Sequence, residues 1–277
     1  MKFKKVYIEI SDKCGLKCSF CPSVKNTRGV MPLELFERIV AQVAGKCQRV
    51  SLHILGDPCR LENLGDYLEI LARFGVGVDL VTSGFYMDRL ELLLRPPVRQ
   101  VAFSLDAGFD RGNPSRGDYL PRILEFCALH QERTSRVFIN LRAQDTTLDS
   151  LPLAEIFGFF GRGLPATFRP YGRYKLAEYI FFNIHKTFTW ADIASEARNA
   201  RKVCHALSEQ VGILSSGVVV PCCIDASGLI ALGNLRELSL EEILNSPRAV
   251  AIKRGFERGE ACEELCQKCL FPTTRSL

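Results

Sequence analysis

Three thiols lie within eight residues in the stretch Cys14-Gly15-Leu16-Lys17-Cys18-Ser19-Phe20-Cys21. The stretch follows an alternating apolar run, Val6, Ile8 and Ile10, which is typical of a strand. One short loop with this spacing can surround a single inorganic centre, and thiolates are preferred ligands of iron–sulfur clusters. Three cysteines leave one iron of a four-iron cluster without a protein ligand. That iron would be the open position that a catalytic metal site needs.

The same spacing also fits half of a zinc site, part of a disulfide framework, or chance. Zinc sites usually complete their ligand set with a second nearby Cys or His pair. No such pair follows Cys21 before Cys47. The iron–sulfur interpretation is therefore preferred.

Composition narrows the class of protein. The 277 residues provide for one large domain or two smaller ones, and 47% apolar residues indicate a globular chain. No uncharged apolar segment approaches the roughly 18 residues of a membrane helix, and charge returns at Glu9 before a secretory signal can form. Twelve cysteines without such a signal indicate the reducing cytoplasm. The net charge of +5 permits an anionic substrate or RNA and argues for neither.

Up to about residue 170, strand-like and helix-like segments alternate, which predicts right-handed crossovers and a parallel sheet. The predicted strands are Val6–Ile10, Val50–Leu55, Val76–Thr82, Val98–Leu105, Val137–Leu141 and a short Thr167–Arg169. The predicted helices between and after them are Pro32–Ala44, Leu64–Phe74, Arg89–Leu94, Leu120–Arg133 and Leu153–Phe160. Six units are too few for an eight-fold barrel.

The spacing Cys-x3-Cys-x2-Cys resembles the signature of the radical S-adenosylmethionine (radical SAM) enzymes. The resemblance implies an open, partial (β/α)6 TIM-like barrel and a [4Fe–4S] cluster held by Cys14, Cys18 and Cys21. In that family the open iron binds the methionine moiety of SAM. An electron from the cluster then cleaves SAM, and the 5′-deoxyadenosyl radical takes a hydrogen atom from the substrate. Phe20 matches a family position that packs near the adenine.

Further SAM contacts are expected at the carboxyl ends of the strands, where parallel α/β folds bind ligands. Leu55-Gly56-Asp57-Pro58 resembles the family's Gly-Gly-Glu-Pro, although Leu55 and Asp57 depart from it. Thr82-Ser83-Gly84 resembles Thr-Asn-Gly, and Ser104-Leu105-Asp106 resembles a segment near the ribose. The SAM-contacting residues implied are Phe20, Gly56, Asp57, Ser83, Ser104, Asp106, Asn140 and Arg142. Arg142 suits the SAM carboxylate because its planar fork pairs a carboxylate bidentately.

The strand–helix rhythm stops near residue 185, so we predict a barrel domain over residues 1–184 and a second domain over 185–277. The second domain is expected to contain a helix over Ala194–Leu207, a hairpin of Val211–Leu214 and Val218–Val220, and helices over Leu240–Asn245 and Pro247–Gly259.

The cysteines of this second domain resemble those of SPASM/Twitch domains, and their number suits the shorter Twitch form with one four-cysteine auxiliary [4Fe–4S] cluster. The implied ligands are Cys204, Cys222, Cys266 and Cys269, with Cys262 in reserve. A zinc site of the same four thiolates is the alternative.

The expected function is a radical SAM reaction on a small metabolite or a peptide, and the expected outcome is a two-electron oxidation helped by the auxiliary cluster. The cluster motif begins at residue 14, which leaves no room for an N-terminal peptide-recognition domain and favours a small molecule, or a peptide presented by a separate partner. A flavodoxin- or ferredoxin-type electron donor is expected. The alternatives are a peptide maturase, an RNA-modifying enzyme, or a non-catalytic iron–sulfur or zinc protein. The sequence identifies neither the substrate nor a catalytic residue beyond the cofactor ligands.

Overall fold

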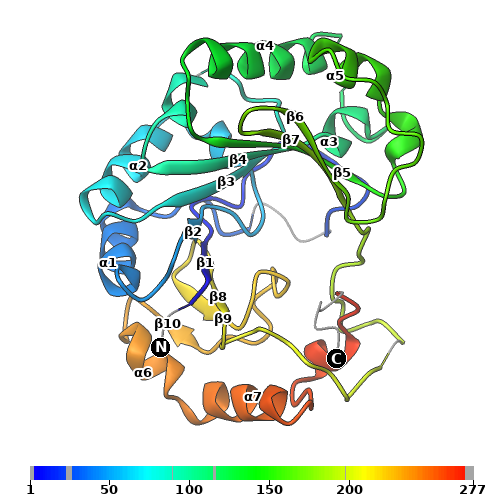
Figure 1. Ribbon diagram of the computed structural model, residues 1–277. Helices are drawn as coiled ribbons and strands as arrows, with labels where there is room; N and C mark the ends of the chain where they lie inside the picture. The colour runs from blue at the N-terminus through cyan, green and yellow to red at the C-terminus, as the bar shows by residue number, and fades with distance from the viewer. Residues whose placement is uncertain (1–2, 23–26, 89, 115–116, 197, 272–277) are drawn as a thin grey trace.

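The computed structural model describes residues 3–22, 27–88, 90–114, 117–196 and 198–271 (Figure 1). These residues form one sheet of ten strands in the order β10-β9-β8-β1-β2-β3-β4-β5-β7-β6. Among them, no helix combines the length and apolar character that crossing a membrane would require.

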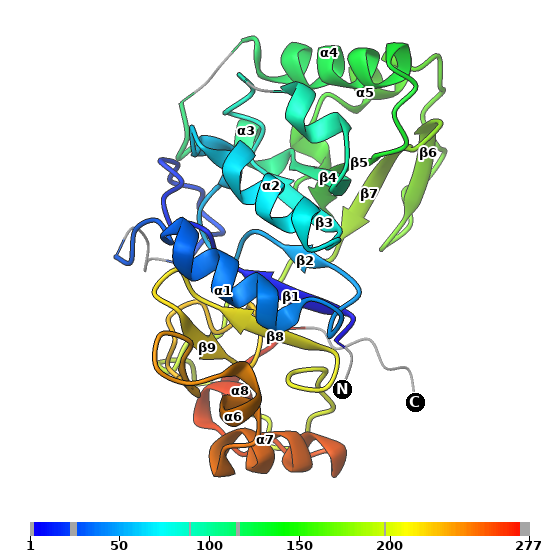
Figure 2. The ribbon, with the colours of Figure 1, turned by 90° about the vertical axis from the view of Figure 1, so that its left-hand side faces the viewer.

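The centre of the sheet is a curved run of parallel strands. In spatial order they are β1 (Lys5–Ile8), β2 (Val50–Ser51), β3 (Val78–Thr82), β4 (Val98–Ser104), β5 (Phe138–Gln144) and β7 (Ile180–His185). The crossovers carry α1 (Leu33–Val43), α2 (Leu64–Arg73), α4 (Tyr119–Glu132) and α5 (Leu153–Phe159), which cover the outer face of the curve (Figures 1 and 2). The shorter elements are η1 (Pro58–Arg60), η2 (Leu90–Leu94), α3 (Asp106–Phe109) and η3 (Leu148–Ser150).

The outer helices pack through one apolar face each. In α1 the buried positions include Leu35, Phe36, Ile39, Val40 and Val43, which follow the three-and-four spacing of one helix face. Most residues of β3 and β4 beneath them are buried, as expected for a parallel sheet covered by helices.

The sixth parallel strand is not where the sequence predicted it. Thr167–Arg169 forms no strand, and Thr167 and Arg169 are exposed, which a strand inside a covered parallel sheet cannot be. The position beside β5 is taken by β7 (Ile180–His185), in register from Ile139 with Ile180 to Gln144 with His185. A hairpin precedes it, in which β6 (Arg173–Ala177) runs antiparallel to β7 and forms the edge of the sheet.

The C-terminal part continues the same sheet from its other side. β8 (Gln210–Ile213) pairs in parallel with β1, and β9 (Val218–Val220) and β10 (Gly233–Asn234) follow antiparallel. Below them lie α6 (Leu240–Leu244), α7 (Pro247–Glu257) and the short α8 (Glu264–Lys268) (Figures 1 and 2). The predicted barrel and second domain therefore meet through backbone hydrogen bonds between strands.

The helix predicted over Ala194–Leu207 is wrong, since the described residues of that range contain no helix. Most of residues 192–201 are exposed, so the segment has no apolar face to bury as a helix would. Its backbone is instead held by the C-terminal helical segment: Lys202 N donates to Gly259 O at 2.8 Å, and Ala261 N donates to Ala200 O at 2.8 Å.

Candidate iron–sulfur and SAM site

The loop between β1 and α1 carries Cys14, Cys18 and Cys21, all half-buried, and a second loop braces it. Asn113 lies after α3 and donates from Nδ2 to Cys18 Sγ at 3.1 Å, while its Oδ1 accepts from Lys17 N at 2.7 Å. Next to it, the Asp110 carboxylate accepts from Ser19 N at 2.9 Å and from Ser19 Oγ at 2.6 Å. The loop that follows α3 therefore orients the middle thiol of the cluster motif.

The surroundings of Cys14, the first thiol of the cluster motif, change its pKa. Burial, with the nearby Asp57 carboxylate adding to the shift, raises the pKa of Cys14 to about 11. A thiol with this pKa is protonated at neutral pH, so iron binding must displace its proton. Among the described residues, no three Cys, His, Asp or Glu side chains converge as ligands of one metal ion. A four-iron cluster is larger than one ion, and three thiols on one loop match its donor chemistry.

A cavity of about 400 Å³ opens beside this loop, within the usual size range of small-molecule sites. Five of the residues predicted to serve the cluster or SAM line it together: Phe20, Cys21, Ser104, Asp106 and Arg142. The rest of its wall is Ala143, Gln144, Tyr171, His185, Lys186, Phe188, Trp190 and Phe271. Trp190 also fixes the loop, since its Nε1 donates to Phe20 O at 3.1 Å.

Arg142 is a buried cation in the wall of this cavity. It lies on β5, and burial lowers its pKa, partly offset by Tyr7 and Asp106. Its Nε is buried and has no hydrogen-bond partner among the described residues. A buried cation left with an unsatisfied donor is costly unless an anion pairs with it. Arg142 therefore places a buried positive charge in the cavity wall, and a positive charge suits the carboxylate of SAM.

Asp57 and Ser83 lie outside the cavity lining and bind each other. The Asp57 carboxylate accepts from Ser83 N at 2.8 Å, Ser83 Oγ at 2.5 Å, Thr82 Oγ1 at 3.0 Å and Cys59 N at 3.0 Å. Both oxygens are thus occupied by protein donors, and they tie the segment after β2 to the end of β3. A direct contact of either residue with SAM stays a prediction.

Gly56 and Asn140 also lie away from the cavity lining. Gly56 has φ +73°, and a Cβ there would stand 2.2 Å from Ser11 O, so only glycine lets this segment lie against the chain leading into the cluster loop. Asn140 accepts from Asn183 Nδ2 at 2.5 Å, while its own buried Nδ2 has no partner among the described residues. Their contacts with SAM likewise stay predictions.

The four tail cysteines assigned to the auxiliary cluster line one small cavity of about 30 Å³: Cys204, Cys222, Cys266 and Cys269. They come from the extended segment before β8, the end of β9, and α8 with the residue after it. Burial raises the pKa of Cys266 to about 12, with Cys204 and Cys269 adding to the shift. Cys262 is exposed and outside this lining.

Two relevant groups escaped the sequence reasoning. Asn113 contacts Cys18 across 95 positions of sequence, and Trp190 contacts Phe20 across 170. Neither lies in a motif, and only the folded chain brings each of them to the cluster loop.

The geometry thus defines an α/β protein whose cysteine loop and open cavity meet at the carboxyl ends of a parallel sheet. The sequence matches the radical SAM superfamily over residues 8–141 and an iron–sulfur cluster-binding SPASM domain over residues 204–270. The chain belongs to the radical SAM superfamily and carries a C-terminal SPASM-type domain. SAM and iron–sulfur clusters, in the barrel and in the C-terminal domain, are accordingly its cofactors, as the sequence predicted.

Solved structures confirm the predicted fold class, a partial barrel followed by a small cysteine-rich domain. A crystal structure of BtrN in complex with AdoMet and 2-DOIA matches with a TM-score of 0.65 at 17% identity, covering 98% of this chain and 94% of BtrN. Streptococcus suis SuiB bound to S-adenosylmethionine matches with a TM-score of 0.65 at 18% identity, covering 92% of this chain and 68% of SuiB. The enzyme anSMEcpe with bound AdoMet matches with a TM-score of 0.57 at 16% identity, covering 89% and 82%. No curated protein matches the chain in sequence.

Proposed function

We propose that this chain cleaves SAM reductively and uses the resulting 5′-deoxyadenosyl radical to take a hydrogen atom from a small metabolite, in a two-electron oxidation. The observation that carries the proposal is Arg142, a buried cation with an unsatisfied donor in the wall of the cavity that also contains Cys21 and Phe20. An anion site beside the cluster motif is what SAM requires.

Each residue has a distinct task in this proposal. Cys14, Cys18 and Cys21 hold the cluster, which when bound supplies the electron that cleaves SAM. Arg142 pairs with the SAM carboxylate, and Phe20 packs on the adenine. The ribose lies near Ser104 and Asp106, whose carboxylate is fixed by Gln144 N at 3.0 Å and by Thr147 Oγ1.

The outer part of the cavity supports a small substrate. Tyr171, Phe188 and Trp190 provide apolar walls, and about 400 Å³ must be shared between SAM and its partner. His185 lines the same wall, and burial, followed by the charge of Arg142, lowers its pKa to about 4, so its imidazole is neutral at pH 7. BtrN was solved with AdoMet and 2-DOIA, whereas SuiB and anSMEcpe were also solved with peptides; the match over 94% of BtrN, against 71% of SuiB and 86% of anSMEcpe in the peptide complexes, favours the small molecule.

Cys204, Cys222, Cys266 and Cys269 would hold an auxiliary [4Fe–4S] cluster, which would supply the acceptor that the second electron of such an oxidation needs. A flavodoxin- or ferredoxin-type protein supplies the first electron, and twelve cysteines support placing the reaction in the reducing cytoplasm.

The reaction type is tested on the substrate mass. Anaerobic incubation of the iron-loaded protein with SAM, reductant and a mixture of small metabolites should yield a product two mass units lighter than its precursor. The omission of SAM is the control and should abolish that pair of masses. A SAM-dependent product of unchanged mass, as from an epimerase or a mutase, would contradict the oxidation.

The Arg142→Gln variant should bind SAM about tenfold or more weakly while keeping its iron, because it loses a charge-assisted contact but no cluster ligand. Its thermal midpoint should not fall, since the buried Nε that is removed has no hydrogen-bond partner among the described residues. Arg173→Gln is the matched control: Arg173 is exposed, lies over the Phe181 ring at 3.7 Å and is outside the cavity lining. Equal SAM dissociation constants for wild type and Arg142→Gln would show that the carboxylate binds elsewhere.

A further inference from the structure

Glu9 is a fully buried carboxylate just after β1, five positions before the first cysteine of the cluster motif. Burying a charged carboxylate costs free energy unless donors surround it. A residue of this kind at this position requires an explanation that the sequence motif does not supply.

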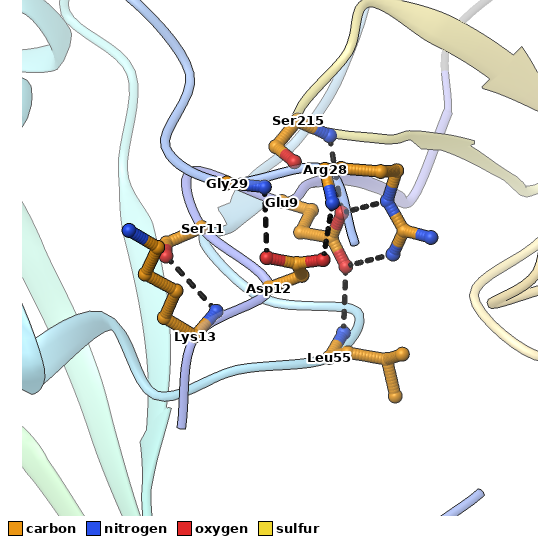
Figure 3. A network of polar contacts seen from close by, with 8 residues as sticks. All are labelled: Glu9, Ser11, Asp12, Lys13, Arg28, Gly29, Leu55 and Ser215. Carbon is orange, nitrogen blue, oxygen red and sulfur yellow. Dashed lines mark hydrogen bonds and ion pairs between the residues drawn. The ribbon is translucent and has the colours of Figure 1, made fainter. Parts of the chain in front are cut away.

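The carboxylate of Glu9 receives four hydrogen bonds, shown in Figure 3. Arg28 donates from Nη2 to Oε1 at 2.8 Å and from Nε to Oε2 at 2.9 Å, a two-pronged ion pair. Two backbone groups complete the shell: Leu55 N donates to Oε1 at 3.1 Å, and Ser215 N donates to Oε2 at 3.1 Å. Each oxygen therefore holds one prong of the arginine and one backbone amide.

The donors belong to three different parts of the molecule. Arg28 lies on the returning arm of the cluster loop, so it and Glu9 stand at the two ends of the segment that contains the cysteines. Leu55 lies in the segment after β2, and the residue that follows it, Gly56, packs against Ser11. Ser215 lies in the turn between β8 and β9, 206 positions from Glu9 and inside the SPASM-type domain.

A second carboxylate closes the base of the same loop. Asp12 is fully buried and accepts from Arg28 N at 2.8 Å and from Gly29 N at 3.0 Å (Figure 3). Lys13 N donates to Ser11 Oγ at 3.1 Å beside it. Side chain and backbone of Arg28 are thus held by two different acids of the arm that leads to Cys14.

We propose that Glu9 is a positioning residue that aligns the cluster loop with both the segment after β2 and the C-terminal domain. The inference rests on the proposed function, because it assigns Glu9 a role in holding SAM at the cluster. Through the hydrogen bond from Ser215 N to Glu9, the C-terminal domain helps to support the loop that carries the first cluster motif. This contribution is separate from the cysteines of the C-terminal domain itself. Partners of this indirect kind typically change metal affinity or activity by about 10- to 100-fold when they are removed.

A purely structural role for Glu9 would make a different prediction. Loss of a buried ion pair lowers stability wherever it lies. Asp79 provides the comparison, because it is also buried and bridges Lys5 and Arg49 at 3.2 Å each, at the amino ends of the strands. It lies at the end of the sheet opposite the cluster loop.

The test compares Glu9→Gln with Asp79→Asn in the full-length, iron-loaded protein. The readouts are iron content, thermal midpoint, the SAM dissociation constant, and the shift that SAM causes in the electron paramagnetic resonance spectrum of the reduced protein. Glu9→Gln should raise the SAM dissociation constant about tenfold or more and reduce the spectral shift. Asp79→Asn should lower the thermal midpoint but leave both SAM readouts at wild-type values.

Glu9→Gln with a lowered midpoint but wild-type SAM affinity and spectrum would overturn the inference. If Glu9→Gln does not fold, Arg28→Lys supplies the same readouts, because lysine keeps the charge and loses the two-pronged geometry. Arg28→Lys with wild-type SAM binding would then overturn the proposal. A wild-type protein that fails to bind or cleave SAM would contradict the proposed function itself, so the two failures are distinguishable.

Discussion

Replacing Cys14, Cys18 and Cys21 together with alanine is expected to remove about half of the iron and all SAM cleavage. The proposal places two [4Fe–4S] clusters on the chain, about eight irons, and only the first has an open iron for SAM. The four tail cysteines surround a separate small cavity, so their cluster should remain in the variant. Iron and sulfide analysis with a chromatographic assay for 5′-deoxyadenosine measures both effects.

Two single variants serve as controls for the loss of a thiol as such. Cys127 is fully buried in the core of the barrel, and Cys47 lies just beyond α1, so Cys127→Ala and Cys47→Ala should keep the iron and the cleavage activity. A triple variant that keeps its full iron content would contradict the ligand assignment. Zinc in place of the remaining iron would contradict an auxiliary iron–sulfur cluster at the tail cysteines.

Replacing Cys222 or Cys269 with alanine is expected to abolish product formation while SAM cleavage continues. The reason is that both thiols belong to the tail cavity and neither lines the cavity beside the cluster loop. Without the auxiliary group, the oxidation lacks an acceptor for its second electron, and SAM is consumed without product. The measurement is the ratio of product to 5′-deoxyadenosine, which should fall from near one towards zero.

Cys262→Ala is the matched control for these variants, because Cys262 lies in the same segment but is exposed and outside the tail cavity. It should keep the wild-type ratio. If Cys262→Ala uncouples the reaction and Cys269→Ala does not, the fourth ligand has been assigned to the wrong thiol. If both single variants keep the ratio, the tail cysteines only brace the fold.

The sequence predicted those parts of the site that depend on local spacing. One loop after a strand carries Cys14, Cys18 and Cys21, and they are close enough in sequence to meet in space. Phe20 was predicted from its position in the cysteine motif, and Ser104, Asp106 and Arg142 from their positions at strand ends; the structure brings all four to one cavity. Parallel strands make this step reliable, because their carboxyl ends share one edge of the sheet.

The errors in the fold come from segments without a strong period. Thr167–Arg169 was taken as the last strand, whereas the apolar residues Ile180, Phe182 and Ile184 supply the inward face of β7 further along. The helix expected around Cys204 fails because the residues before it are mostly exposed. In both regions tertiary burial decided the outcome, and local propensity carried little information.

Contacts between distant segments were beyond the reach of sequence patterns. The contact of Asp57 with SAM stays a prediction, and the hydrogen bonds that Asp57 accepts from Ser83, Thr82 and Cys59 could not be read from its place in a motif. The hydrogen bond from Ser215 N to Glu9 exists only because β8 lies beside β1, and no local sequence pattern predicts that pairing. Such bonds satisfy buried polar groups, and their partners are chosen by topology.

The central claim is that this chain cleaves SAM at the cluster held by Cys14, Cys18 and Cys21. It is tested most directly by incubating the anaerobically iron-loaded wild-type protein with SAM and dithionite and quantifying the products. The account predicts 5′-deoxyadenosine and methionine in equal amounts, formed only when both iron and reductant are present. An iron-loaded protein that binds SAM and forms neither product under these conditions would contradict it.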